Sequence, residues 1–150
     1  CPGQIVISGQ AEAVQEASGR LKEAGARKCI PLKVSGPFHS GLLAGAGKRL
    51  GEELEGIPVK NPSLPYVSNV EADYVVSGAR VKELLVRQVS STVRWRESME
   101  RMLADGVDTF IEIGPGRTLA GFLRKMSRDV KVVNVGTVGE LEGLLRSREA

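Results

Sequence analysis

The sequence predicts an α/β fold in which a mostly parallel sheet is flanked by helices. Short apolar runs rich in Val and Ile, which are typical of buried strands, recur along the chain. Longer segments with apolar residues three or four apart, which are typical of amphipathic helices, separate these runs. Because parallel strands need long crossover connections, this alternation of strands and helices favours a parallel sheet.

The first 34 residues predict a β-α-β unit. Residues 4–9 (QIVISG) and 28–34 (KCIPLKV) are expected to be parallel strands, and residues 10–25 a helix that buries one apolar stripe. Pro31 places the second strand at a sheet edge or a bulge. Since the chain opens at Cys1 without Met and enters a strand almost at once, we expect it to begin in the middle of a larger protein.

The remaining residues continue the alternation. The predicted strands lie at 66–70, 108–114 and 131–135, and the predicted helices at 41–55, 79–90, 95–105, 118–127 and 138–148. Trp95, the only tryptophan, is expected to anchor the start of a helix in the core, with its indole N–H bonded to a carbonyl.

Composition excludes several classes of function. The formal net charge of +3 is spread along the chain, and aromatic residues make up only 4%, so no nucleic-acid partner is expected. One histidine and two cysteines exclude a zinc-like cluster, and no metal site is expected. Two cysteines are too few for a disulfide framework, and the sequence has no signal peptide or apolar span of membrane length. We therefore expect a cytoplasmic protein with no membrane partner.

The segment Gly114-Pro115-Gly116-Arg117-Thr118 follows a predicted strand and opens a predicted helix, as phosphate-binding loops do. Its spacing lacks the third glycine of a dinucleotide loop and the Gly-Lys-Ser/Thr of a nucleoside-triphosphate loop. We interpret it as a tight strand-to-helix turn, and we expect no cofactor.

The only histidine, His39, lies in VSGPFHSGLL (34–43), at the exit of a predicted strand where α/β sheets place their sites. It can act as a general base if a Ser or Cys lies within hydrogen-bond reach and another group fixes its tautomer. Ser35 and Ser40 are too near in sequence to predict a dyad, and the chain has no Gly-x-Ser-x-Gly elbow. The residues alone leave a catalytic and a structural role equally open.

Four stretches of the sequence carry a resemblance to a known family. They are CPGQIVISG at the start, PLKVSGPFHSGLL around His39, VRQVSSTVRW at 86–95 and EIGPGRTLAGFLRK at 112–125. In this order and at these spacings, the chain resembles the malonyl-CoA:acyl-carrier-protein transacylase family over nearly its whole length. The resemblance implies an α/β-hydrolase-like acyltransferase domain with an inserted ferredoxin-like subdomain. Residues 1–34 would be the second half of the insert, and residues 35–150 the C-terminal part of the large subdomain, whose N-terminal half with the nucleophile elbow is missing.

The resemblance also implies roles for three residues. His39 matches the general base of a Ser–His dyad, and Gln88 matches the residue whose main-chain carbonyl supports the imidazole. Phe38 matches a substrate-binding position at which phenylalanine accompanies a preference for malonyl groups. The family's nucleophilic serine, its malonate-binding arginine and its oxyanion-hole glutamine lie upstream, so none of them can be assigned in this chain.

The implied reaction moves malonyl from malonyl-CoA to the phosphopantetheine thiol of acyl carrier protein, through an acyl-serine, in fatty-acid biosynthesis. The expected partners are malonyl-CoA as substrate and acyl carrier protein. Two alternatives stay open: an acyltransferase domain of a polyketide synthase, and a non-catalytic module that binds carrier protein.

Overall fold

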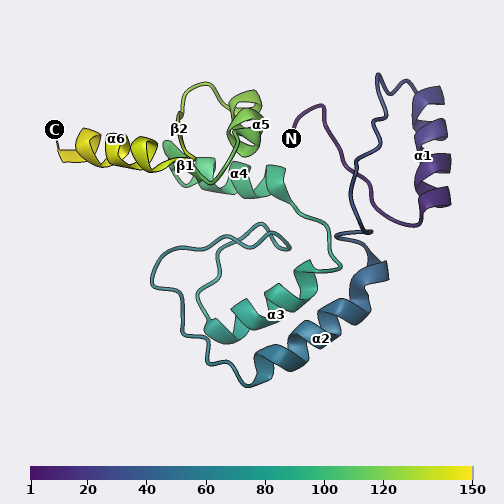
Figure 1. The fold of residues 1–150 in the computed structure, drawn as a ribbon, viewed down its shortest axis with the longest axis horizontal. Coiled ribbons are helices and arrows are strands. Elements are labelled where there is room, and N and C mark those ends of the chain that lie inside the picture. The colour runs from purple at the N-terminus through teal and green to yellow at the C-terminus, as the bar shows by residue number, and fades with distance from the viewer. Residues whose placement is uncertain (150) are drawn as a thin grey trace. The chain divides into compact units, whose positions relative to one another are not determined.

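A computed structural model describes residues 1–149 of the chain, with side chains through residue 147 (Figure 1). The elements are α1 (Ala11–Glu23), a 3-10 turn η1 (Gly41–Leu43), α2 (Ala44–Glu55), α3 (Gly78–Gln88), α4 (Trp95–Ala104), β1 (Thr109–Ile113), α5 (Thr118–Met126), β2 (Lys131–Val135) and α6 (Val138–Glu149). They form two compact units, residues 6–94 and residues 1–5 together with the chain from Trp95 onward. None of the described helices is both long and apolar enough to cross a membrane.

The second unit is built on a parallel pair of strands. β1 and β2 pair in register from Thr109 opposite Lys131 to Ile113 opposite Val135. The crossover is α5, which buries Ala120 and Leu123. The predicted strands at 108–114 and 131–135 and the helix between them are therefore confirmed, and this part of the chain is α/β.

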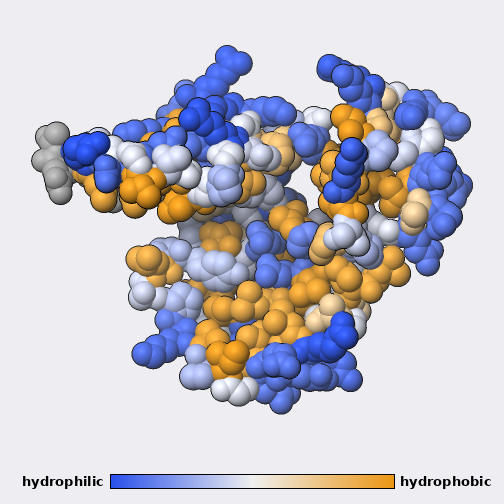
Figure 2. Space-filling model, in the orientation of Figure 1, coloured by the Kyte–Doolittle hydropathy of each residue, from blue (hydrophilic) through white to orange (hydrophobic). Residues whose placement is uncertain are grey.

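In the other unit, α2 packs closely against α3 because two glycines of α2 face α3. A Cβ added at Gly47 would lie 3.1 Å from the Val86 carbonyl oxygen, and one at Gly51 would lie 3.4 Å from the Val86 side chain. Gly47 is itself buried. These glycines weaken α2 as an isolated helix, but they let the two backbones approach. Figure 2 shows apolar surface gathered over this pair of helices.

The start of α3 is fixed by a second close approach. A Cβ at Gly78 would lie only 2.2 Å from the Val59 carbonyl oxygen, so no other residue fits there without a shift of the backbone. The Asn61 side chain accepts a hydrogen bond from the Gly78 N–H at 2.9 Å, which satisfies one of the free donors at the helix N-terminus. Together these contacts hold α3 at its N-terminal end.

The predicted β-α-β unit of residues 1–34 does not form. Residues 4–9 and 28–34 are irregular rather than strands, and Ile5 and Ile30 are 90% and 71% exposed. α1 forms as predicted, but it buries no residue. The physical reason is that a strand needs neighbours to complete its hydrogen bonds, and no strand in the described part of the chain pairs with either segment.

Two further expectations are wrong. Residues 66–70 form no strand but only a single antiparallel bridge between Val67 and Tyr74, because the chain turns back at once through residues 68–73. The Trp95 side chain is partly buried, yet its indole N–H finds no partner among the described residues. The predicted bond from this N–H to a carbonyl is therefore absent.

Candidate active site

His39 lies in a constrained turn between the irregular segment 28–34 and η1. Its φ of 59° is in the left-handed region, which a residue with a Cβ rarely adopts. The Ser40 hydroxyl donates to the Pro37 carbonyl oxygen at 2.6 Å, and the Leu43 N–H donates to the Ser40 carbonyl oxygen at 3.0 Å. These bonds hold the turn closed around an exposed imidazole, and such strain is typical of functional sites.

The structure brings His39 together with Gln88. The Nδ1 atom of His39 lies 3.0 Å from the main-chain carbonyl oxygen of Gln88, 49 residues further along the chain. Since a carbonyl oxygen can only accept, Nδ1 must carry the proton of this bond. In the neutral ring Nε2 then has a free lone pair, which is the arrangement that a general base needs.

The position of Gln88 explains why its carbonyl is available. Gln88 is the last residue of α3, and the carbonyl groups of the last helical turn have no partner within the helix. The Ser91 N–H approaches this oxygen at a long 3.4 Å, which leaves room for the imidazole. The C-terminal end of a helix also carries partial negative charge, so it attracts an N–H donor.

Close packing of α2 on α3 brings the two residues together. α2 begins soon after the histidine turn, and its Gly47 lies against Val86 and Val89, which flank Gln88 on both sides. The glycines of α2 therefore determine how near the turn lies to the end of α3. The sequence alone did not reveal this use of the two glycines.

Phe38 lies beside His39 with its side chain 51% exposed. Its ring folds back toward Gly36, where an added Cβ would lie 3.8 Å from the ring. An exposed aromatic ring next to the imidazole is available to contact a bound molecule.

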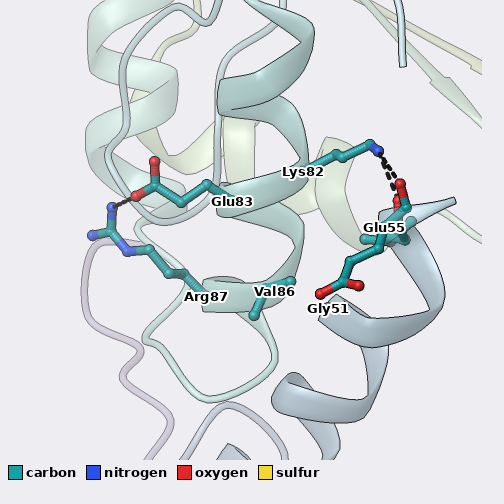
Figure 3. A pocket seen from close by; sticks show the side chains of 7 residues that line it. Gly51, Glu55, Lys82, Glu83, Val86 and Arg87 are labelled. Atoms are coloured by element: carbon teal, nitrogen blue, oxygen red, sulfur yellow. Dashed lines mark hydrogen bonds and ion pairs between the residues drawn. The ribbon is translucent and has the colours of Figure 1, made fainter. Parts of the chain in front are cut away.

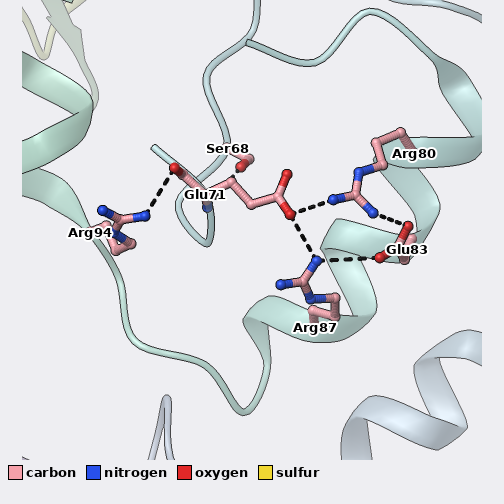
Figure 4. A network of polar contacts seen from close by, with 6 residues as sticks. All are labelled: Ser68, Glu71, Arg80, Glu83, Arg87 and Arg94. Carbon is pink, nitrogen blue, oxygen red and sulfur yellow. Dashed lines mark hydrogen bonds and ion pairs between the residues drawn. The ribbon is translucent and has the colours of Figure 1, made fainter. Parts of the chain in front are cut away.

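Sequence reasoning missed a group of polar residues behind Gln88. The Asn69 Nδ2 donates to the Gln88 side-chain oxygen at 3.3 Å. Next to Asn69, the Glu71 carboxylate accepts hydrogen bonds from Arg80 and Arg87 of α3 (Figure 4). The Arg80 and Arg87 guanidinium groups hold the pKa of Glu71 below its usual range. The only sequence signal was a polar Ser-Asn pair at a predicted strand end, which is common at turns.

The Gly114–Thr118 segment forms the turn from β1 into α5, as predicted. The Glu112 carboxylate accepts hydrogen bonds from the Leu119 and Ala120 N–H groups at 3.1 and 2.9 Å. These N–H groups, with the Asn134 amide, hold the pKa of Glu112 below its usual range despite partial burial. The Glu112 carboxylate thus occupies two of the N–H groups at the start of α5, where a helix attracts negative charge.

A shallow groove also lies between α2 and α3. It is lined by Gly51, Leu54, Glu55, Lys82, Glu83, Val86 and Arg87 (Figure 3). The Lys82 ammonium donates to the Leu54 carbonyl oxygen at 2.7 Å, so this charge caps the end of α2. Among the side chains of residues 1–147, no three His, Cys, Asp or Glu groups gather as a metal site would require.

Comparisons with known proteins identify the family of the chain. Residues 1–143 match the model of the acyl transferase domain family. The chain belongs to this family. It is 47% identical over 142 residues to the malonyl CoA-acyl carrier protein transacylase of Bacillus subtilis, covering 95% of this chain and 45% of that protein. The transacylase of the same name from Haemophilus influenzae is 37% identical over 143 residues, and the match covers 95% of this chain and 46% of that protein.

Solved structures of the acyl transferase family show the same fold. The chain superposes on a transacylase (MCAT) from Streptococcus pneumoniae with a TM-score of 0.86 and 40% identity, covering 93% of this chain and 45% of that one. The chain also superposes on a malonyl-transacylase solved in complex with a type II polyketide synthase acyl-carrier protein. The TM-score is 0.88 and the identity 36%, and the match covers 93% of this chain and 45% of that one. The resemblance inferred from the sequence is confirmed, and the chain spans about half the length of these relatives.

Proposed function

We propose that this chain is the C-terminal portion of a malonyl-CoA:acyl-carrier-protein transacylase, and that His39 is its general base. The observation that carries the proposal is the 3.0 Å contact between His39 Nδ1 and the Gln88 carbonyl oxygen, which leaves Nε2 free to take a proton. The relatives named above, which are transacylases of this kind, support malonyl-CoA and acyl carrier protein as the substrate and the partner.

The same proposal extends to the architecture. Residues 1–34 would be the second half of a ferredoxin-like subdomain, and residues 35–150 the C-terminal part of an α/β-hydrolase-like subdomain. Two observations support it. One is the α1 helix between two unpaired apolar segments, and the other is the parallel β1–β2 pair with its crossover helix. The nucleophilic serine would belong to the portion of the acyltransferase that this chain does not span.

In the proposed mechanism, Nε2 of His39 removes the proton of the serine hydroxyl while the serine oxygen attacks the malonyl carbonyl carbon. The carbon–sulfur bond of the thioester breaks, and the departing coenzyme A thiolate takes the proton from Nε2. The thiol of the carrier protein then loses its proton to His39, and its sulfur attacks the carbonyl carbon of the acyl-serine. The ester carbon–oxygen bond breaks, and His39 returns the proton to the serine oxygen. Throughout, the Gln88 carbonyl would hold the ring in one tautomer. This chemistry requires no cofactor, and its product would feed fatty-acid biosynthesis.

The proposal can be tested in a chimera that joins the upstream segment of the Bacillus subtilis transacylase to residues 1–150 of this chain. We expect the chimera to form a stable malonyl-enzyme with malonyl-CoA, detectable by intact mass, and to pass the malonyl group to carrier protein with ping-pong kinetics. A folded chimera that binds carrier protein without forming the acyl-enzyme would contradict the proposal and favour a binding module.

Phe38 gives a prediction about specificity. Phe38→Ser in the chimera should raise the rate with methylmalonyl-CoA relative to malonyl-CoA, because the exposed ring beside His39 would crowd an α-methyl group. One methyl group is worth about 1–3 kcal/mol in a pocket, so the gain should be partial, about 10- to 200-fold. Competition between the two thioesters measures it.

Leu42→Ser serves as the matched control, since Leu42 is a similarly exposed apolar residue nearby in η1, with 53% of its surface accessible. We expect it to leave the ratio of the two rates unchanged. An unchanged ratio in Phe38→Ser, or an equal change in Leu42→Ser, would exclude a selective role for the ring.

A further inference from the structure

Gln88 is held at two points. Its main-chain carbonyl meets His39, and its side-chain oxygen accepts a hydrogen bond from the Asn69 amide at 3.3 Å. We infer that Asn69 is a positioning residue: through the Gln88 side chain it sets the Gln88 carbonyl against the imidazole. This inference rests on the proposed function, because it concerns the alignment of the proposed base.

The end of α3 needs such a tether because its own backbone bonds are long. The N–H groups of Val89, Ser90 and Ser91 reach carbonyl oxygens of α3 at 3.4, 3.3 and 3.4 Å, against about 2.9–3.0 Å for a typical N–H···O bond. Helix ends fray when they are held by weak backbone bonds alone. A side-chain bond from a separate segment restricts this movement at the residue whose carbonyl meets His39.

Asn69 is itself rigidly held, as a tether must be. It lies in the turn 68–73, in which the Ser68 N–H donates to the Asp73 carbonyl oxygen at 3.0 Å and the Ala72 N–H to the Ser68 carbonyl oxygen at 2.9 Å. Ser68 is only 1% exposed. The Asn69 carbonyl oxygen accepts from the Arg94 N–H at 2.8 Å, so the backbone is fixed on both sides of the Asn69 side chain.

The same turn is also joined to α3 by charge. The Glu71 carboxylate accepts from Arg87, the residue before Gln88, at 2.9 Å and from Arg80 two turns earlier (Figure 4). Glu83 bridges the same two arginines from within α3. These ion pairs join the turn 68–73 to α3, and the Asn69 amide is the contact of this turn with the Gln88 side chain.

The hydrogen bond between Asn69 and Gln88 predicts that the Gln88 side chain, and not only its carbonyl, affects kcat. If Gln88 acted through its carbonyl alone, replacing its side chain would leave catalysis intact. With Asn69 as the tether, Gln88→Met and Asn69→Ala should each lower kcat of the chimera about 10- to 100-fold, the scale of a misplaced catalytic group. The KM for malonyl-CoA should not change. The double variant should be no slower than either single one, because both remove the same bond.

Two further variants separate positioning from general stability. Gln88→Glu keeps an acceptor oxygen for the Asn69 amide and should retain most of kcat. Asn61→Ala removes an asparagine bond at the opposite, N-terminal end of α3, at Gly78. It should lower the unfolding temperature of the chimera and leave kcat unchanged. Equal losses of kcat in Asn61→Ala and Asn69→Ala would overturn the inference.

A readout without turnover completes the test. In nitrogen-15 NMR spectra of the chimera, the Nδ1 proton of His39, identified by its absence in His39→Ala, should exchange faster with water in Asn69→Ala than in Asn61→Ala. Normal exchange and normal kcat in Asn69→Ala would refute the positioning role even if His39→Ala abolishes transfer. Activity that survives His39→Ala would instead refute the proposed function, and the NMR comparison would still decide the role of Asn69.

Discussion

Replacing His39 with alanine in the chimera should slow malonyl transfer about 10²- to 10⁴-fold, the usual contribution of a positioned general base. Both half-reactions should slow, because the same Nε2 would take the proton of the serine hydroxyl and later that of the carrier thiol. Single-turnover acylation with malonyl-CoA and deacylation by carrier protein measure the two steps separately.

Ser40→Ala is the natural control for this substitution. It removes the hydroxyl that donates to the Pro37 carbonyl oxygen in the same turn but leaves the imidazole and the Gln88 carbonyl in place. We expect a much smaller loss of rate than in His39→Ala, together with a lower unfolding temperature. Near-normal acylation in a folded His39→Ala chimera would show that another group acts as the base.

The 150-residue chain by itself should be inactive and should not unfold cooperatively as a monomer. It contains no assignable nucleophile for His39, and it exposes the apolar segments that the sequence marks as core strands. Besides Ile5 and Ile30, both Leu32 and Val34 are more than half exposed. Unpaired, exposed apolar segments favour association or local unfolding.

Calorimetry and light scattering of the isolated chain test this prediction, with the chimera as the folded reference. In a ferredoxin-like sheet the third and fourth strands are separated by the first, and residues 4–9 and 28–34 would be that separated pair. Supplying the upstream segment of the Bacillus subtilis transacylase as a second polypeptide should therefore restore both cooperative unfolding and acylation. A sharp monomeric transition and full activity of the chain alone would disprove the prediction.

Local sequence patterns predicted the helices well but failed for the strands near the start. The α5 helix has its own apolar face and basic residues in its last turn, and both signals lie within the helix sequence. Residues 4–9 and 28–34 have equally strong strand patterns, yet a strand exists only where a neighbouring strand accepts its hydrogen bonds. Between β1 and β2 that neighbour is within the chain, and so the prediction held there.

The sequence by itself determined the family, through four motifs in order, and it singled out His39 with Phe38 and Gln88. Only the tertiary structure decided how His39 and Gln88 meet, because their 3.0 Å contact depends on the glycine-mediated packing of α2 on α3. Only the tertiary structure placed Asn69 and Glu71 behind Gln88, since a side-chain bond between residues 19 positions apart leaves no periodic trace in the sequence. Periodicity reports which face of an element is buried, whereas an active site depends on where separate elements end and meet in space.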